Sequence, residues 1–227
     1  LVISDSKLDT AKRIPEVRRR IDAVLSSRLE STKKNTREVL SQTPHQFEHS
    51  TGVDADRVIM IPTVSSERRE WLPVSFERDA VVNAPNFALY DADIWNFAIL
   101  SSRCHLHWIA SVCGRLKTDF RYSNTMGWNT FPVPKLTEKN KEDLTRCAED
   151  ILLAREAHFP ATIADLYKPE DMPDDLRVAH ERNDETLERI YIGRRFRNDT
   201  ERLEKLFELY TKMTTKDLKS SNSRMKE

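Results

Sequence analysis

The sequence predicts an α+β protein in which a strand-rich middle is flanked by helical segments on both sides. Apolar residues recur at three- and four-residue steps between positions 14 and 40 and again beyond position 137, the spacing of a buried helical stripe. Between positions 57 and 90, short β-prone runs such as RVIMIP are separated by Pro, Asn, Asp and Ser, which is typical of strands joined by turns. At 227 residues the chain can form one large domain or two small ones.

These patterns divide the chain into four segments. We predict a linker and helical spacer over 1–50, a strand-rich domain with a central helix over 51–136, a helical bundle over 137–215 and a polar tail over 216–227. The central helix is expected from the apolar run 93–113, with Gly114 at its C-terminal cap. The start signal Asn198-Asp199-Thr200 predicts a further helix in the bundle.

Charge is balanced over the whole chain but not along it. The formal net charge is zero, from 37 Lys and Arg against 37 Asp and Glu, so the overall balance favours no polyanionic partner. Residues 11–40 carry nine basic and four acidic side chains, whereas residues 137–190 carry eight and fifteen. A basic segment can bind nucleic acid, and both segments can equally be solvated helix faces.

Composition and missing motifs narrow the function classes. No run of ~18 apolar residues and no signal peptide pattern is present, so no membrane partner is expected. Three cysteines without a disulfide pattern suit a reducing cytoplasm. The start LVISDSK lacks methionine, which suggests a fragment of a longer chain. GxGxxG, a P-loop, the Asn-Pro-Pro-Tyr-type motif and a nuclease carboxylate–lysine cluster are all missing, so we expect binding without a catalytic site.

A metal site is disfavoured by spacing. Cys104, His105, His107 and Cys113 have the side-chain types of zinc ligands. On a helix, however, positions 105 and 107 point to different faces, and no second Cys/His pair at metal spacing follows. Core cysteines and hydrogen-bonded histidines explain the cluster better, so no metal is predicted.

A polar cluster follows the first strand-rich run. Ser65 and Ser66 stand beside Arg68 and Arg69 at an expected strand end. No partner motif accompanies the serines, which disfavours a nucleophile. Arg and Ser can donate to phosphate oxygens without reading sequence. Surface pairing of the arginines with the flanking glutamates is an equally good explanation.

The segment 114–124, GRLKTDFRYSN, concentrates cationic and hydrogen-bonding groups. Lys117 and Asp119 are two residues apart, so in an extended segment both side chains would point the same way. Lysine can donate to O6 and N7 of guanine, and a carboxylate can accept from N4 of the paired cytosine. The pair could therefore read one G·C pair, although Lys-x-Asp is also common on protein surfaces.

Residues 101–134, SSRCHLHWIASVCGRLKTDFRYSNTMGWNTFPVP, resemble the target-recognition region of the MmeI-like bifunctional restriction-modification enzymes, the single-chain type IIG/IIL family. Three further stretches are similar to that family in the same order. Residues 14–47 resemble its helical spacer, 58–76 the opening of its recognition domain and 166–213 its C-terminal helical domain.

The resemblance implies a specificity module within a longer polypeptide that also carries an endonuclease and an adenine-N6 methyltransferase. Residues 51–136 would then be the target recognition domain. The expected partners are double-stranded DNA and the methyltransferase domain of the same chain. S-adenosylmethionine, and Mg²⁺ for cleavage, would belong to the other domains, so this segment is expected to hold no cofactor.

The resemblance also implies roles for single residues. Lys117 and Asp119 match the family's pair that reads the last target base beside the methylated adenine, where Lys/Asp goes with guanine and Glu/Arg with cytosine. Arg121 matches a further base-reading position, paired with Ala84 or Pro85. From their chemistry and not from the resemblance, we expect further groups to contact the DNA backbone, together with basic groups of the first helix. They are Ser65, Ser66, Arg68, Arg69, Arg115, Tyr122, Ser123 and Asn124.

Two other interpretations remain open from the sequence. The chain could be a stand-alone specificity subunit that recruits separate catalytic subunits. It could also be a helical adaptor without catalytic activity whose charged faces bind another protein.

Overall fold

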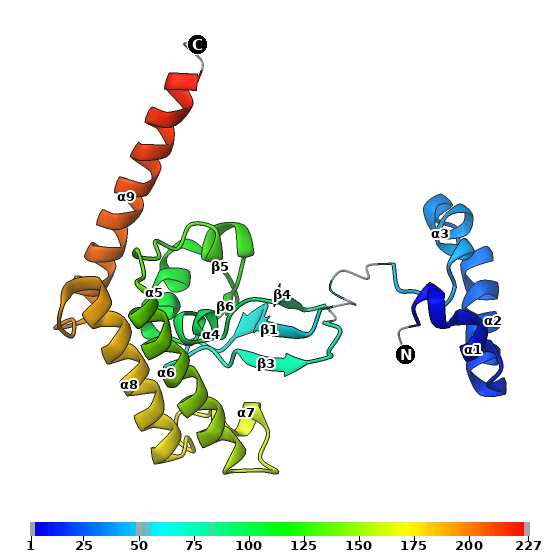
Figure 1. Ribbon diagram of the computed structural model, residues 1–227, viewed down its shortest axis with the longest axis horizontal. Helices are drawn as coiled ribbons and strands as arrows, with labels where there is room; N and C mark the ends of the chain where they lie inside the picture. Colours follow the sequence, from blue (N-terminus) through cyan, green and yellow to red (C-terminus); the bar gives the residue numbers. More distant parts are fainter. Residues whose placement is uncertain (1–2, 49–51, 53–54, 83, 225–227) are drawn as a thin grey trace. The chain divides into compact units, whose positions relative to one another are not determined.

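The computed structural model describes residues 3–48, 52, 55–82 and 84–224, and their side chains as far as residue 215. The chain forms two compact units, Leu1–Ala55 and Asp56–Glu227. Helices and two small antiparallel sheets together confirm the predicted α+β class (Figure 1).

The first unit is entirely helical in its described part. Its helices are η1 (Asp5–Lys7), α1 (Leu8–Lys12), α2 (Pro15–Leu29), α3 (Lys34–Glu38) and η2 (Leu40–Gln42). Pro15 begins α2, where a missing backbone N–H costs nothing. The stripe between 14 and 40 predicts one helical segment, but the chain turns back after Leu29. Arg28 stabilises this turn by donating to the carbonyls of Leu40 (2.5 Å), Thr43 (2.8 Å) and Gln46 (2.7 Å).

Two three-stranded antiparallel sheets form the strand-rich part of the second unit. The first has the order β3-β1-β4, from β1 (Arg57–Pro62), β3 (Ser75–Arg78) and β4 (Asn86–Tyr90). The second has the order β2-β6-β5, from β2 (Val64–Ser65), β5 (Gly114–Leu116) and β6 (Asp119–Arg121). Thr63 connects β1 to β2, so the chain passes directly from one sheet to the other.

The apolar run 93–113 forms two helices and not the single central helix that its composition predicts. Helix α4 (Trp95–Leu100) ends at Ser101, and α5 (Arg103–Val112) starts anew after Ser102. The Ser102 backbone is extended, and its side chain accepts from the His105 N–H (3.2 Å), as an N-cap does. Gly114 is also not a helix cap, because it begins β5 and pairs with Arg121.

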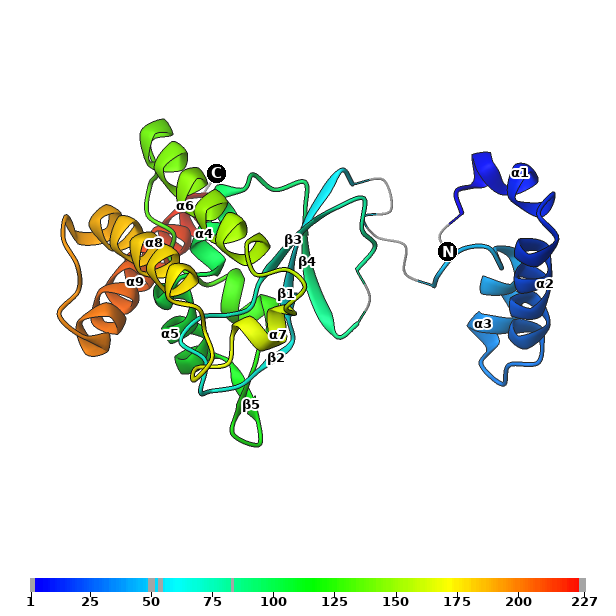
Figure 2. The same cartoon turned by 90° about the horizontal axis from the view of Figure 1, so that it is seen from below.

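The remaining elements of the second unit are helices. They are η3 (Asn124–Trp128), α6 (Glu138–Glu156), α7 (Ile163–Leu166), α8 (Asp174–Ile192) and α9 (Asp199–Arg224). Asn198 caps α9 by accepting from the Glu201 N–H (2.9 Å), which confirms the predicted start signal. Helix α9 continues through Arg224, into the segment 216–227 expected to be a polar tail. Helix α6 packs against α4 and lies beside α8 (Figures 1 and 2).

Buried polar contacts join the strand-rich part to α6 and α8. The Asp184 carboxylate on α8 accepts from the Trp71 indole N–H (2.8 Å) and from the Arg103 backbone N–H (2.8 Å). Burial raises the pKa of Asp184 to about 7, although both hydrogen bonds and the Arg103 charge act in the opposite direction. Arg155 on α6 donates to the Val74 carbonyl (2.6 Å). The strand-rich part and helices α6 and α8 therefore belong to the same compact unit.

A buried ion pair joins α8 to α9. The Arg202 guanidinium and the Glu188 carboxylate are 2.5 Å apart, with 7% and 4% of their side chains exposed. The second Glu188 oxygen accepts from the Phe196 N–H (2.9 Å). Removing one partner of such a pair leaves the other charge buried and uncompensated.

Arg202→Ala is expected to lower the free energy of unfolding by about 3–5 kcal/mol, because Glu188 loses its buried cation. Arg194→Ala is the matched control. It removes a more exposed pair with Glu201 and is expected to cost ~0–1 kcal/mol. Urea unfolding followed by circular dichroism measures both variants, and equal losses would contradict the burial argument.

Candidate nucleic-acid interface

The segment predicted to read DNA is a β-hairpin. Strands β5 and β6 pair in the register Leu116↔Asp119, so Lys117 and Thr118 form a two-residue turn. Lys117 has a left-handed backbone (φ 57°) and an exposed side chain at the tip. The prediction that the chain is extended from Lys117 to Asp119 is therefore wrong. The two residues are neighbours across the end of a turn, and strand alternation does not align their side chains.

Arg115 stabilises the hairpin from one face. Its guanidinium donates to the Thr118 carbonyl (2.7 Å) and stacks over the Phe120 ring, 4.8 Å from the ring centre. Phe120 is buried and belongs to the core of the second unit. The cation thus ties the turn to a core residue while its own side chain stays exposed.

Glu67 lies beside the turn and is absent from the residues predicted as a site. A hydrogen bond from its own backbone N–H lowers the pKa of Glu67, and the Thr118 hydroxyl and the Arg115 charge act in the same direction. The Asp119 carboxylate is a further neighbour. The register Ser65↔Phe120 explains this position, because continuing β2 past Ser65 leads towards the turn. No local sequence signal reveals a strand pairing between segments so far apart.

Thr63 brings the two halves of the second predicted base-reading site together. Its N–H donates to the Pro85 carbonyl (3.1 Å), and its carbonyl accepts from the Tyr122 N–H (2.8 Å). Arg121 pairs with Val64 in the same sheet, and its side chain is exposed. Ala84 and Pro85 are also exposed, in the turn before β4. Asn83, in the same loop, lies outside the described residues.

The predicted backbone-contacting residues near β2 differ in accessibility. Arg68 is exposed and donates to Glu170 (3.1 Å), from the segment between α7 and α8. Arg69 is half-buried, and its guanidinium lies 3.4 Å from the Ser65 hydroxyl. Ser65 is buried, whereas Ser66 remains half-exposed. The exposed pair with Glu170 is of the kind that contributes little in water, so Arg68 can exchange this partner.

Tyr122 is a core residue, which argues against the phosphate contact expected of it. Its hydroxyl hydrogen-bonds to Nε2 of His105 (3.0 Å), and its ring packs against Phe87 with 5.6 Å between ring centres. Burial raises the Tyr122 pKa, and burial lowers the pKa of His105 to about 3, which keeps the imidazole neutral. The buried Ser65 hydroxyl is likewise turned to protein and not to solvent.

Ser123 and Asn124 lie at the start of η3. The Ser123 hydroxyl accepts from the Met126 N–H (3.4 Å), and the Asn124 side chain accepts from the Thr125 N–H (2.9 Å). Asn124 is exposed, so its amide N–H groups face solvent. Gly127 within this turn lies against Ile109, Cys113 and Tyr122, where an added Cβ would approach to 3.2–3.3 Å.

Within the described ranges, no three His, Cys, Asp or Glu side chains gather where a metal ion could bind. His107 instead contacts Asp199 (3.1 Å), and the Cys113 thiol faces the Ser123 carbonyl. Over the same ranges, no helix is both long enough and apolar enough to span a bilayer.

Tyr122→Phe is expected to lower the free energy of unfolding by about 1–3 kcal/mol, because it leaves a buried imidazole without its partner. Nδ1 of His105 already has no hydrogen-bond partner among the described residues. The affinity of the folded variant for DNA should equal that of the wild type in fluorescence anisotropy. A loss of affinity without a loss of stability would instead support the phosphate contact.

Comparisons with known proteins agree with the family expected from the motifs. Residues 1–135 match the family model described as MmeI, target recognition domain, and residues 136–218 match that of the MmeI C-terminal domain. The first match therefore includes the helical segment over 1–50. DNA methyltransferase A of Bacillus subtilis (strain 168) is 39% identical over 215 residues, which cover 94% of this chain and 24% of that protein.

A solved structure is also similar. The type IIL restriction-modification enzyme MmeI in complex with DNA aligns with a TM-score of 0.82 and 32% identity, over 95% of this chain and 29% of that one. The chain thus spans about a quarter of the length of the relatives that it matches. With both family models covering nearly all of its length, the chain belongs to the MmeI family, in the part that comprises the target recognition and C-terminal domains.

Proposed function

We propose that the chain is the DNA-sequence-recognition module of a restriction-modification enzyme and that it reads bases in the major groove. The observation that carries this proposal is the exposed hairpin β5–β6 in a chain of the MmeI family. A two-stranded ribbon fits the major groove, and the relative of known structure is described in complex with DNA. The hairpin has the shape and the polar groups that base reading needs.

The tip of the hairpin carries the first reading pair. The Lys117 ammonium donates to O6 and N7 of guanine, while the Asp119 carboxylate accepts from N4 of the paired cytosine. The free, exposed position of Lys117 and the half-exposed position of Asp119 support these roles. Each contact contributes about 1–3 kcal/mol of discrimination against the wrong base. The pair reads the last base of the target, next to the methylated adenine.

A second reading point lies where β6 ends. Arg121 is exposed there, and the Thr63 backbone connects this end of β6 to the turn that contains Ala84 and Pro85. Ala84 and Pro85 offer no side-chain hydrogen bond. Their role is to limit which base edge the Arg121 guanidinium can reach.

Sequence-independent contacts hold the module on the duplex. Arg68, Arg69 and Arg115 donate to phosphate oxygens, with Ser66 and Asn124 as neutral donors. Such contacts release counterions, so binding weakens steeply as salt increases. Ser65 and Tyr122 are buried, so we do not include them among the residues that contact phosphate oxygens.

The proposal assigns chemistry to other parts of a longer polypeptide. Those parts would transfer a methyl group from S-adenosylmethionine to N6 of adenine and, where an endonuclease is present, cleave DNA with Mg²⁺. The described residues of this chain gather no metal-binding group. A separate specificity subunit and a protein-binding adaptor are the alternatives that the following experiments distinguish.

Exchanging the reading pair, Lys117→Glu with Asp119→Arg, is expected to change the base after the methylated adenine from G to C. The reason is that the donor and the acceptor then face the opposite halves of the base pair. Single-molecule sequencing of DNA from cells that express the full-length parent maps the methylated sites. The matched control exchanges the surface pair Asp150 and Arg182 and should leave the site unchanged.

Methylation with an unchanged final base would keep the family assignment and overturn the roles of Lys117 and Asp119. No methylation by a well-expressed parent would favour the adaptor. Methylation only in the presence of a separately encoded methyltransferase would favour the specificity subunit.

Replacing single arginines separates base reading from backbone binding. Arg121→Ala is expected to relax preference at one base position by about 1–3 kcal/mol. Arg68→Ala should weaken binding to all sequences alike and reduce the slope of log K against log salt by about 1. Fluorescence anisotropy on a set of single-position duplex variants measures both effects. A uniform loss from Arg121→Ala would assign that residue to the backbone.

A further inference from the structure

The first compact unit has too small a core to be stable by its own packing. Among residues 3–48, the only apolar side chains that are buried are Ile3 and Ile21. The apolar side chains left largely exposed in the same segment are Ile14, Val24, Leu29, Val39 and Phe47. A helical unit of this size cannot offset its conformational entropy with so little burial. Part of this apolar surface must therefore be covered in the functional protein.

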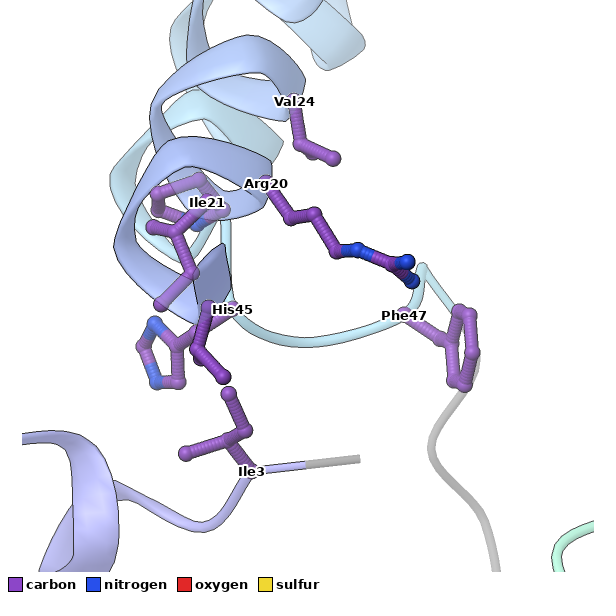
Figure 3. A pocket seen from close by; sticks show the side chains of 8 residues that line it. Ile3, Arg20, Ile21, Val24, His45 and Phe47 are labelled. Atoms are coloured by element: carbon purple, nitrogen blue, oxygen red, sulfur yellow. The ribbon is translucent and has the colours of Figure 1, made fainter. Parts of the chain in front are cut away.

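An apolar groove marks where one such contact would form (Figure 3). Val17, Ile21 and Val24 lie one and two turns apart on α2 and form one wall. Pro44, His45 and Phe47, from the segment after η2, also line the groove. The groove has a volume of about 160 Å³, and a cavity of about 150 Å³ with aliphatic walls is large enough for a benzene ring. It can thus hold one large apolar side chain.

Hydrogen bonds fix the shape of the groove. Nε2 of His45 donates to the Asp5 carboxylate (2.7 Å), which joins this part of the lining to η1. Arg28 binds the carbonyls of Thr43 and Gln46 on either side of Pro44 and His45. A preformed groove loses little conformational entropy on binding.

Arg20 gives the groove its charge preference. Its exposed side chain lies at the groove and extends towards Phe47 (Figure 3). In the described part of the chain Arg20 has no hydrogen bond or ion pair, whereas Arg18 faces Asp22 and Arg19 binds Glu16. A carboxylate on the occupant would complement this cation. The fitting segment therefore combines a bulky apolar side chain with a neighbouring Asp or Glu.

Two other occupants fit less well. A second copy of this unit would bring together two basic segments, since residues 11–40 carry nine basic and four acidic side chains. DNA phosphates would gain nothing from a groove lined by Val17, Val24 and Phe47. The relatives of this chain are about four times as long, so most of such a polypeptide is available as a partner.

We propose that this groove docks an amphipathic, acidic segment of the methyltransferase portion of the same polypeptide. The inference rests on the proposed function, because that function supposes such a portion. Docking at Val24, Phe47 and Arg20 would fix the recognition module to the catalytic part through the helical unit. The apolar side chain would complete the missing core of the unit, and the carboxylate would pair with Arg20.

A photo-cross-linking amino acid at Phe47 in the full-length parent tests the proposal. Benzoylphenylalanine resembles Phe in shape, and Phe47 is 44% exposed, so the change is compatible with folding. Peptide mass spectrometry should find cross-links to an acidic amphipathic segment outside residues 1–227. The matched control places the same amino acid at Val39, which is 56% exposed and does not line the groove. Its yield should be several-fold lower.

Charge reversal tests the role of Arg20 in the same assay. Arg20→Glu is expected to reduce the Phe47 cross-link several-fold, whereas Arg19→Glu on the same helix should leave it unchanged. Cross-links to residues 56–227, to a second copy, or at the level of the Val39 control would overturn the proposal. No DNA is needed, so the outcome is independent of whether the module reads bases, which methylation mapping decides.

Discussion

The second unit depends on one buried carboxylate, Asp184 on α8. A buried carboxylate must be hydrogen-bonded to be tolerated, and Asp184 takes its partners from two distant segments, the Trp71 indole and the Arg103 backbone. Trp71 follows the polar turn after β2, and Arg103 begins α5, the helix that leads into β5. A single residue of helix α8 thus fixes the two segments that flank the hairpin in the fold, one containing Trp71 and the other beginning with Arg103. Glu70 adds to this connection by pairing with Arg103 and with Arg177 of α8.

The distribution of ion pairs separates scaffold arginines from those available to a ligand. Arg103, Arg177 and Arg202 are all paired with carboxylates and have largely covered side chains. Lys117 and Arg121, in contrast, have no side-chain partner within the described residues and stand exposed at the hairpin. Unpaired donors at one exposed edge suit an anionic or polar ligand, since no internal partner must first be displaced.

The sequence predicts the fold class, the strand-rich middle and the start of α9, because these depend on periodicity and local capping. It does not predict the turn at Lys117, since a left-handed backbone is expected of Gly or Asn and rarely of Lys. It also does not reveal the break at Ser102, where the apolar run continues on both sides. The role of Tyr122 depends on His105, a contact that only folding creates. Pairing of β2 with β6, which brings Glu67 to the turn, is equally non-local.

The position of Glu67 has a consequence for how the proposed reading pair can change. Asp119 does not stand alone, because the Glu67 carboxylate also lies beside the turn, where it interacts with Asp119, Thr118 and Arg115. A lone Asp119→Arg change would place the new guanidinium next to Glu67, and their ion pair would compete with donation to a base. With Glu at position 117 as well, the sum of the three formal charges stays at its wild-type value, whereas the lone change raises it by two. The base preference of the hairpin therefore depends on the charge of Glu67 as well as on the charges at positions 117 and 119.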